Sequence, residues 1–312
     1  VGTHAIIQDK AEFKNLGLVI ADEQHRFGVE QRAKLSEKGK NPHMLIMSAT
    51  PIPRTLALIL YGDLDISVID ELPPGRKTVK TYAVGENMRA RITAFIEKNV
   101  KNGTQVYVVC PLVEETEKSD LENAENLSKK LQQTFPGFRV GLVYGKMKNN
   151  LKDEVMNDFA DGKIDILVST TVIEVGVNVP NANLMIVENA ERFGLSQLHQ
   201  LRGRVGRGAE QAYCVLISHG NSKIIKKRME TMCISNDGFY ISEQDLKLRG
   251  PGDFFGTRQH GLPEMKIANL FEDGDILRDA QQAAKDIISG NIQCGKLRER
   301  CKKLFIDKIV MN

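Results

Sequence analysis

Several features that mark other classes of protein are scarce or absent in this sequence of 312 residues. There is no tryptophan, and none of the five cysteines lies in a C-x-x-C pair, which argues against a zinc ribbon and favours free thiols in a reducing compartment. No apolar run approaches the roughly 20 residues that cross a bilayer, and the amino-terminal residues do not resemble a signal peptide. We therefore expect a soluble cytoplasmic protein with no membrane partner.

A strong charge of either sign is also missing, since the formal net charge is only +3. Any surface that binds nucleic acid must therefore be local. A further absence concerns nucleotides: no G-x-x-x-x-G-K-[ST] phosphate loop occurs, and Gly145-Lys146 is followed by methionine. The chain begins at Val1 in what resembles the end of a structural element, so we expect a fragment of a longer protein.

What is present is an alternation of apolar runs and helical patterns, which is typical of an α/β fold with a parallel sheet. The runs are apolar throughout, as expected for strands covered on both faces. The sequence predicts strands at 17–21, 44–47, 79–84, 105–110, 139–144, 164–169, 183–187 and 212–217. It predicts helices at 29–38, 55–61, 87–100, 121–134, 151–159, 197–204, 223–232, 243–247, 276–289 and 296–309.

Two changes in this pattern predict domain boundaries. Residues 71–76 contain two prolines and a glycine, which is typical of a linker because proline restricts its own backbone and that of the residue before it. Past about residue 220 the strands stop and charged or amphipathic helices follow. We predict a partial α/β domain with an uncovered sheet face over 1–72, a complete doubly wound domain over 73–220, and a helical region over 221–312.

The first candidate site follows the first two predicted strands. Asp22 and Glu23 adjoin a strand's carboxyl end, where an aspartate can hold Mg²⁺ and a glutamate can activate water for attack on a nucleotide phosphate. Ser48 and Thr50 follow the next strand, and their hydroxyls could relay the nucleotide state through hydrogen bonds with His25. A solvated acidic turn and a Ser/Thr turn before proline are the simpler alternatives.

The second candidate site is the basic stretch QLRGRVGR at 200–207. Arg204 and Arg207 lie three apart in a predicted helix, so they would share a face and could neutralise charge on a transferring phosphoryl group. Gly203 would allow close approach of the backbone. A basic helix that faces DNA, or a solvated face, is the alternative.

A third stretch, STTVIEVGVNVP, follows the predicted strand at 164–169. The hydroxyls of Thr170 and Thr171, with exposed backbone amides, could grip a nucleic-acid phosphate. Gly176 could admit a nucleotide closely. A strand-to-helix turn with ordinary caps is the alternative.

Taken together, these stretches resemble a known group of proteins. Four of them resemble, in order and spacing, motifs II, III, V and VI of superfamily 2 helicases: DEQH, SATPIPRT, STTVIEVGVNVP and QLHQLRGRVGRG. Residues 1–4 resemble the end of motif Ib, and residues 106–116 resemble motif IV. Four longer stretches resemble one family within that superfamily, the RecG family of bacterial branched-DNA helicases. They are DEQHRFGVEQRAKL, SATPIPRTLAL, ERFGLSQLHQLRGRVGRG and DLKLRGPGDFFGTRQHG. This resemblance covers residues 1 to about 270.

The transcription-repair coupling factors, which are duplex DNA translocases, share this motor and an arginine-rich hairpin. They have an acidic residue at the position of Gln24 and a different stretch in place of RGPGDFFGTRQHG, so both features favour the RecG family. The chain departs from the pattern of many relatives at Tyr144, where they have histidine, and at Asn178, where they have aspartate. The second departure puts in doubt a bond from Asn178 to a ribose hydroxyl.

The resemblance implies roles for the matching positions. Asp22 would bind Mg²⁺ and Glu23 would activate water. The residues at the γ-phosphate would be Gln200, Arg204 and Arg207, with Gly176 and Gly203 near the nucleotide. The residues that couple hydrolysis to domain motion would be His25, Ser48 and Thr50. The DNA-binding or translocation residues would be Thr3, His4, Thr170, Thr171, Arg249, Arg258 and Gln259, the last three within a translocation motif at 245–261.

On this basis 1–72 would be the end of a first RecA-like domain, and 73–220 a complete second one. The implied function is an ATP-dependent translocase, with ATP and Mg²⁺, that remodels replication forks and Holliday junctions in recombination and repair. Its partners would be branched and duplex DNA, with single-stranded DNA-binding protein as a candidate, and we expect a monomer in the bacterial cytoplasm.

In the RecG family the phosphate loop lies upstream of motif Ib, so we expect these 312 residues alone not to hydrolyse ATP. A non-enzymatic module that clamps DNA with the motor fold is the alternative. A phosphate loop encoded upstream of Val1 would favour the motor, and a start codon beside Val1 would favour the clamp. A third alternative is a nucleotide-binding regulator. It does not explain the stretch RGPGDFFGTRQHG, so it ranks last.

Overall fold

The structure is a computed structural model, and it describes most of the chain. The described residues are 2, 4–8, 11–22, 34–35, 37–40, 42–49, 65–71, 73–111, 117–170, 178–249, 273–297 and 299–300. The chain divides into two compact units, one formed by Val1–Pro51 with Asp70–Leu248 and the other by Ile52–Ile69 with Arg249–Asn312. The domain boundaries that the sequence suggested at residues 72 and 220 stay a prediction.

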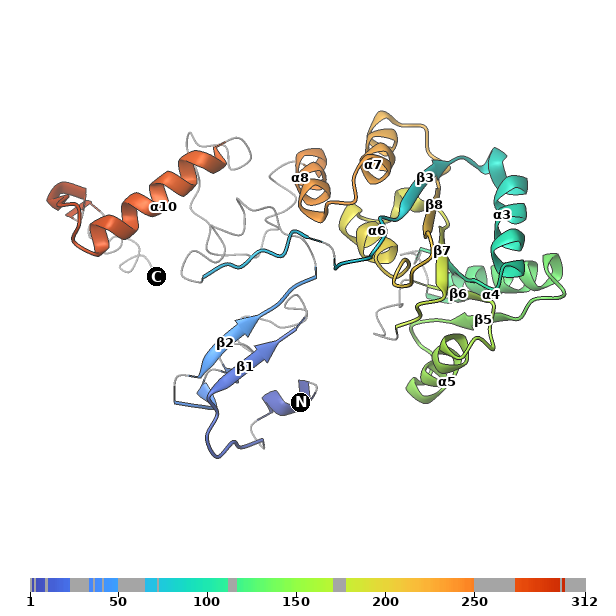
Figure 1. Cartoon of the computed structure of the whole chain (residues 1–312), viewed down its shortest axis with the longest axis horizontal. Coiled ribbons are helices and arrows are strands. Elements are labelled where there is room, and N and C mark those ends of the chain that lie inside the picture. The colour runs from blue at the N-terminus through green and yellow to red at the C-terminus, as the bar shows by residue number, and fades with distance from the viewer. Residues whose placement is uncertain are drawn as a thin grey trace. The chain divides into compact units, whose positions relative to one another are not determined.

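A short parallel sheet of two strands lies near the amino terminus (Figure 1). Its elements are the 3-10 helix η1 (His4–Ile7) and the strands β1 (Leu18–Ala21) and β2 (His43–Ile46). Val19 and Ala21 are buried, whereas Leu18 and Ile20, which point to the opposite face, are 55% and 57% exposed. Among the described residues this sheet is therefore covered on one face only. The predicted uncovered face is present, and the general expectation of strands covered on both faces is wrong for β1.

A sheet of six parallel strands forms the centre of the next part, in the order β3-β8-β7-β4-β6-β5 (Figure 1). The strands are β3 (Lys80–Val84), β4 (Gln105–Val109), β5 (Val140–Val143), β6 (Ile166–Ser169), β7 (Ala182–Val187) and β8 (Tyr213–Ile217). The first and last residues of each strand lie within two positions of those predicted from the sequence. The predicted α/β fold with a parallel sheet is thus confirmed.

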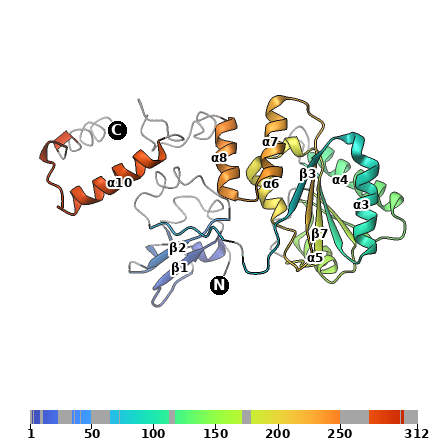
Figure 2. The ribbon, with the colours of Figure 1, turned by 45° about the horizontal axis from the view of Figure 1, so that its top comes forward.

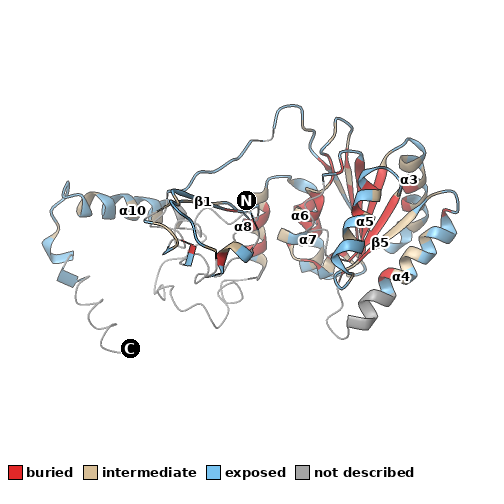
Figure 3. Cartoon of the chain, turned by 90° about the horizontal axis from the view of Figure 1, so that it is seen from below, coloured by how far each residue is buried: buried red, intermediate tan, exposed pale blue. Residues whose placement is uncertain are grey.

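Helices cover both faces of this sheet (Figure 2). They are α3 (Arg89–Lys101), α4 (Glu117–Thr134), α5 (Asn149–Ala160), α6 (Leu195–Arg202), α7 (Lys223–Ile234) and α8 (Gly238–Arg249), with short 3-10 helices η3 (Glu86–Met88) and η4 (Ala190–Arg192). Val106 and Val108 of β4 join a core with α3 and α4, while Tyr107 and Val109 join a second core with α5, α6, α7 and α8. The strands between the two cores are largely buried (Figure 3).

The carboxyl-terminal part contains the helix α10 (Gly274–Ile288), which confirms the helix predicted at 276–289. The helix predicted at 55–61 lies outside the described residues, as does most of the one predicted at 296–309. Within the described part of the chain, no helix combines the length and the apolar character needed to span a membrane.

Candidate functional site

Asp22 and Ser48 lie at one edge of the small sheet. Strands β1 and β2 are parallel, and Ala21 is paired with Ile46, so the residues that follow the two strands emerge at the same carboxyl edge. Both side chains are exposed. The other residues that the sequence placed at this edge lie outside the described residues: Glu23, His25 and Thr50.

The carboxylate of Asp22 fits a magnesium ion, because Mg²⁺ takes oxygen ligands, keeps several waters and is often held by one or two carboxylates. No cluster of three or more His, Cys, Asp or Glu side chains that could hold a metal ion occurs among the described residues.

The helix α6 leads into the arginines of the second candidate site. Its leucines are buried against the sheet, and the helix ends at Arg202. The sequence predicted that it would extend to Arg204 and place Arg204 and Arg207 on one helix face, and this is wrong. A turn follows instead, in which the amides of Gly203 and Arg204 donate to carbonyls of the last helical turn over 3.0 Å each. Gln200 lies in α6 and is half-buried.

Two residues fix the finger loop, which we define as residues 203–207. Val205 is fully buried in the core that also contains the α6 leucines. Gly206 has a φ of +74°, in the left-handed region that favours glycine. Arg204, just before these anchors, is half-buried, and Arg207, just after them, is exposed. The loop thus presents two guanidinium groups from a well-defined backbone.

The finger loop and Gly208, the residue after it, contact the carboxyl-terminal end of the third candidate stretch. Arg207 Nη1 donates a hydrogen bond of 3.3 Å to Asn178 Oδ1. A Cβ on Gly208 would lie 2.6 Å from the carbonyl oxygen of Pro180, so the backbones approach closely there. The fold therefore brings together the stretches that resemble motifs V and VI, and it gives Asn178 an arginine as a partner.

Arg204 and Arg207 also act on Tyr107 of β4. Burial raises the pKa of Tyr107 to about 12, and the positive charges of Arg207 and Arg204 oppose this rise. The tyrosine is 2% exposed, and its ring packs on Phe159 at a centroid distance of 4.8 Å. The two charges therefore lie on the side of the sheet that α5 and α6 cover.

Arg202, the remaining arginine of this stretch, has a structural role. It is 2% exposed, and its Nη1 donates to the carbonyls of Met232 and Ser235, at the carboxyl end of α7, over 2.8 Å each. Its Nη2 lies 2.9 Å from His199 Nδ1. Burial lowers the pKa of Arg202. This guanidinium caps α7.

The third candidate stretch begins with two buried hydroxyls. Ser169 and Thr170 are 0% and 2% exposed, and neither hydroxyl has a hydrogen-bond partner in the described part of the chain. Such groups are costly to bury unpaired, which is compatible with a partner that arrives on binding. Thr171 and Gly176 lie outside the described residues.

The predicted DNA-binding residues are described only in part. His4 lies in η1 and Arg249 ends α8, and only their backbones are described. Thr3, Arg258 and Gln259 lie outside the described residues. These roles stay predictions.

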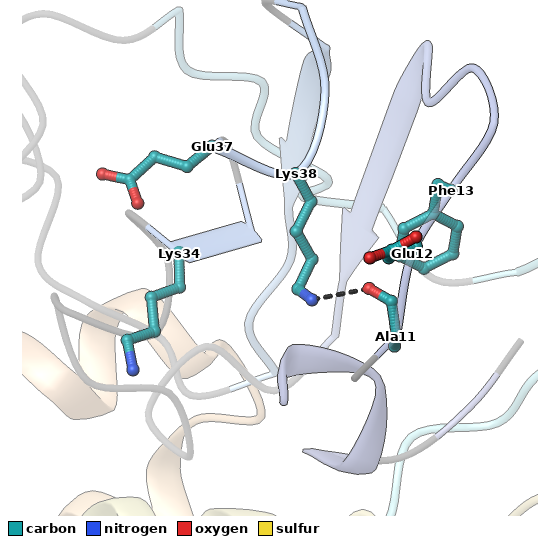
Figure 4. A pocket seen from close by; sticks show the side chains of 6 residues that line it. All are labelled: Ala11, Glu12, Phe13, Lys34, Glu37 and Lys38. Carbon is teal, nitrogen blue, oxygen red and sulfur yellow. Dashed lines mark hydrogen bonds between the residues drawn. The ribbon is translucent and has the colours of Figure 1, made fainter. Parts of the chain in front are cut away.

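A pocket beside the small sheet includes no residue of the three candidate sites. It is lined by Ala11, Glu12, Phe13, Lys34, Glu37 and Lys38 (Figure 4). The ammonium group of Lys38 donates to the carbonyls of Ala11 and Gln8 over 2.8 and 2.7 Å. This lysine therefore joins two segments of the chain.

The sequence interpretation missed Arg76, whose guanidinium contacts the finger loop from the segment before β3. The partners are 127 and 130 positions apart in the sequence, so no local spacing could have indicated the contact.

Three protein-family models match consecutive parts of the chain. They are "DEAD/DEAH box helicase" at residues 1–59, "Helicase conserved C-terminal domain" at 88–209 and "ATP-dependent DNA helicase RecG, domain 3, C-terminal" at 235–301. With the fold described above, these matches define the class as one built from helicase domains: the chain contains part of the first RecA-like domain, and the second as a six-stranded parallel sheet.

Within that class the chain is similar to ATP-dependent DNA helicase RecG. It is 55% identical to RecG from Bacillus subtilis (strain 168), over 93% of the chain and 43% of the relative. It is 51% identical to RecG from Thermotoga maritima, over 92% of the chain and 37% of the relative. A solved structure of RecG bound to a three-way DNA junction has 48% identity and a TM-score of 0.69, and the match covers 89% of the chain and 35% of that structure's chain. The resemblance to RecG is thus confirmed, and the chain spans less than half the length of these relatives.

Proposed function

We propose that the full-length protein is an ATP-dependent DNA helicase that acts on branched DNA, such as replication forks and Holliday junctions. The observation that carries this proposal is the finger loop, which holds Arg204 and Arg207 on a backbone anchored by Val205 and Gly206. An arginine finger needs this pre-organisation, because it stabilises charge that develops only in the transition state. The similarity to RecG, including the structure with a three-way junction, supports branched DNA as the substrate.

We assign the chemical roles as follows from the residue types and their places. Asp22, exposed at the strand edge, would hold the metal ion, and Glu23, the next residue, would take a proton from the attacking water. When bound, Mg²⁺ would neutralise part of the charge on the β- and γ-phosphates. Arg204 and Arg207 stabilise the transferring phosphoryl group, and Gln200 lies in α6, close before Arg204 in the sequence.

The coupling and DNA roles are part of the same proposal. His25, Ser48 and Thr50 would link hydrolysis to domain motion. The DNA contacts would be those of Thr3, His4, Thr170, Thr171, Arg249, Arg258 and Gln259. We also propose a monomer in the bacterial cytoplasm with single-stranded DNA-binding protein as a partner. Light scattering of the purified protein, with and without that partner, tests the monomeric state and the binding of the partner.

The decisive experiment is Arg204→Ala in the full-length protein, with ATP hydrolysis measured on forked DNA. We expect hydrolysis to fall by at least ~10²-fold, as for loss of an arginine finger, while the Kd for the fork changes less than about twofold. Arg91→Ala is the matched control, because Arg91 is an exposed arginine of α3. If binding and hydrolysis fell together, Arg204 would be a DNA contact; unchanged hydrolysis would exclude the finger role.

A further inference from the structure

Arg76 lies in the segment that precedes β3 and that the sequence predicted as a linker. It is half-buried. Its Nε donates to the carbonyl of Gly206 over 3.3 Å, and its Nη2 donates to the carbonyl of Gly203 over 3.4 Å. One guanidinium thus bonds carbonyls on both sides of Arg204.

The segment after Arg76 stays beside the same loop. The Thr78 carbonyl accepts a hydrogen bond of 2.9 Å from Gln211 Nε2. Val79 is buried, and its Cγ2 would lie 3.2 Å from a Cβ on Gly206. The amide of Lys80 donates to the carbonyl of Ala212 over 3.0 Å, where the pairing of β3 and β8 begins. Residues 76–80 therefore line the finger loop and the start of β8.

The geometry of a guanidinium explains why this contact matters. The group is planar and its donors keep fixed directions, so bonding two carbonyls also fixes the distance between them. The two carbonyls belong to Gly203 and Gly206, and the residues between them include Arg204. A change at Arg76 would therefore alter where the Arg204 side chain starts, and small misplacements of catalytic groups can cost about 10²-fold in rate.

We propose that Arg76 is a positioning residue for the arginine finger, which it holds in place from the linker segment. This inference rests on the proposed function of Arg204. Arg76 acts through the backbone of the finger loop and does not touch the nucleotide. Arg76 belongs to the segment predicted to join the two RecA-like domains, so that segment is hydrogen-bonded directly to the finger loop.

The first test compares Arg76→Ala with Lys77→Ala in the full-length protein, since Lys77 is the adjacent, exposed basic residue. For Arg76→Ala we expect kcat for ATP hydrolysis to fall about tenfold or more, with KM for ATP and Kd for forked DNA changed less than about twofold. Arg76→Lys should recover part of kcat, because an ammonium can still donate to one of the carbonyls. Lys77→Ala should behave as the unmodified protein. An unchanged kcat in Arg76→Ala overturns the proposal.

The second test separates positioning from a general loss of structure. In an Arg204→Ala background, measured as single turnovers with excess enzyme, adding Arg76→Ala should cause no further loss of rate, because the group that it positions is gone. If Arg76→Ala lowers that residual rate by the same factor as in the unmodified protein, it does not act through Arg204 and the proposal is wrong. If Arg204→Ala alone leaves the rate unchanged, the proposed finger role fails first.

Discussion

Gly206 shows how the finger loop depends on the backbone of one residue. Its φ is +74°, and an added Cβ would lie 3.1 Å from Ala212 Cβ and 3.2 Å from Val79 Cγ2. We expect Gly206→Ala to lower the free energy of unfolding by about 2–3 kcal/mol, because conformational strain and crowding add. Urea unfolding followed by circular dichroism measures the change.

The chain offers a matched control for this glycine. Gly162 has a φ of +73°, but a Cβ there would meet no atom within 4 Å. Gly162→Ala should therefore cost only the backbone strain, about 1 kcal/mol. Equal losses in the two variants would mean that crowding against Ala212 and Val79 contributes nothing.

Single residues also show what spacing can and cannot predict. The stretch QLRGRVGR contains three arginines, and its resemblance to motif VI identified Arg204 and Arg207 as the fingers, a role that stays a prediction. Nothing in the stretch distinguished Arg202, which is buried against the end of α7. Arg76 could not be connected to the loop at all, because its partners lie more than a hundred positions away.

The junction of α6 and α7 makes stability depend on pH through His199. Its Nδ1 lies 2.9 Å from Arg202 Nη2, so the neutral ring accepts from the guanidinium. Burial, and then the charge of Arg202, lower the pKa of His199 from 6.5 to about 4. The unfolded chain therefore binds a proton more readily between these values. This contribution to stability is complete above pH 6.5 and is lost as the pH falls to about 4, by up to about 3 kcal/mol.

Unfolding in urea between pH 4 and pH 7.5 tests this expectation against His199→Gln. The glutamine oxygen can still accept from Arg202, but the side chain does not titrate. Carboxylates contribute to acid unfolding in both proteins, so the difference between the two curves isolates the histidine. Parallel curves would show that His199 does not control stability in this range.

At the scale of elements, strands were easier to predict than helix ends. Strands β4, β6 and β7 are buried at every residue, so each appears as a largely apolar run that ends with the strand, whereas the edge strand β3 includes the exposed Lys80 and Tyr82. Helix ends depend on local hydrogen bonds. Helix α8 begins at Gly238, five residues before its predicted start at 243. At this observed start, Asp237 Oδ1 accepts a hydrogen bond of 2.8 Å from the amide of Phe239. Helix α6 stops at Arg202 because a turn through Gly203 follows.

In the part of the chain that the structure describes, a parallel sheet of six strands is combined with a two-stranded sheet whose Leu18 and Ile20 are exposed. The chain contains the proposed metal ligand and fingers, but no G-x-x-x-x-G-K-[ST] loop occurs in its 312 residues. Without the backbone amides and lysine of such a loop, ATP loses most of its phosphate contacts.

We therefore expect the 312-residue chain to hydrolyse no ATP above background on forked DNA, whereas the full-length protein turns over. A steady-state ATPase assay of both, at equal concentration and with saturating Mg²⁺, makes the comparison. Circular dichroism of the chain should show its helices and strands, so that inactivity cannot be ascribed to a failure to fold. A rate near that of the full-length protein would mean that these residues hold the phosphates by other groups, and the assignment of Asp22 as half of a larger site would have to be abandoned.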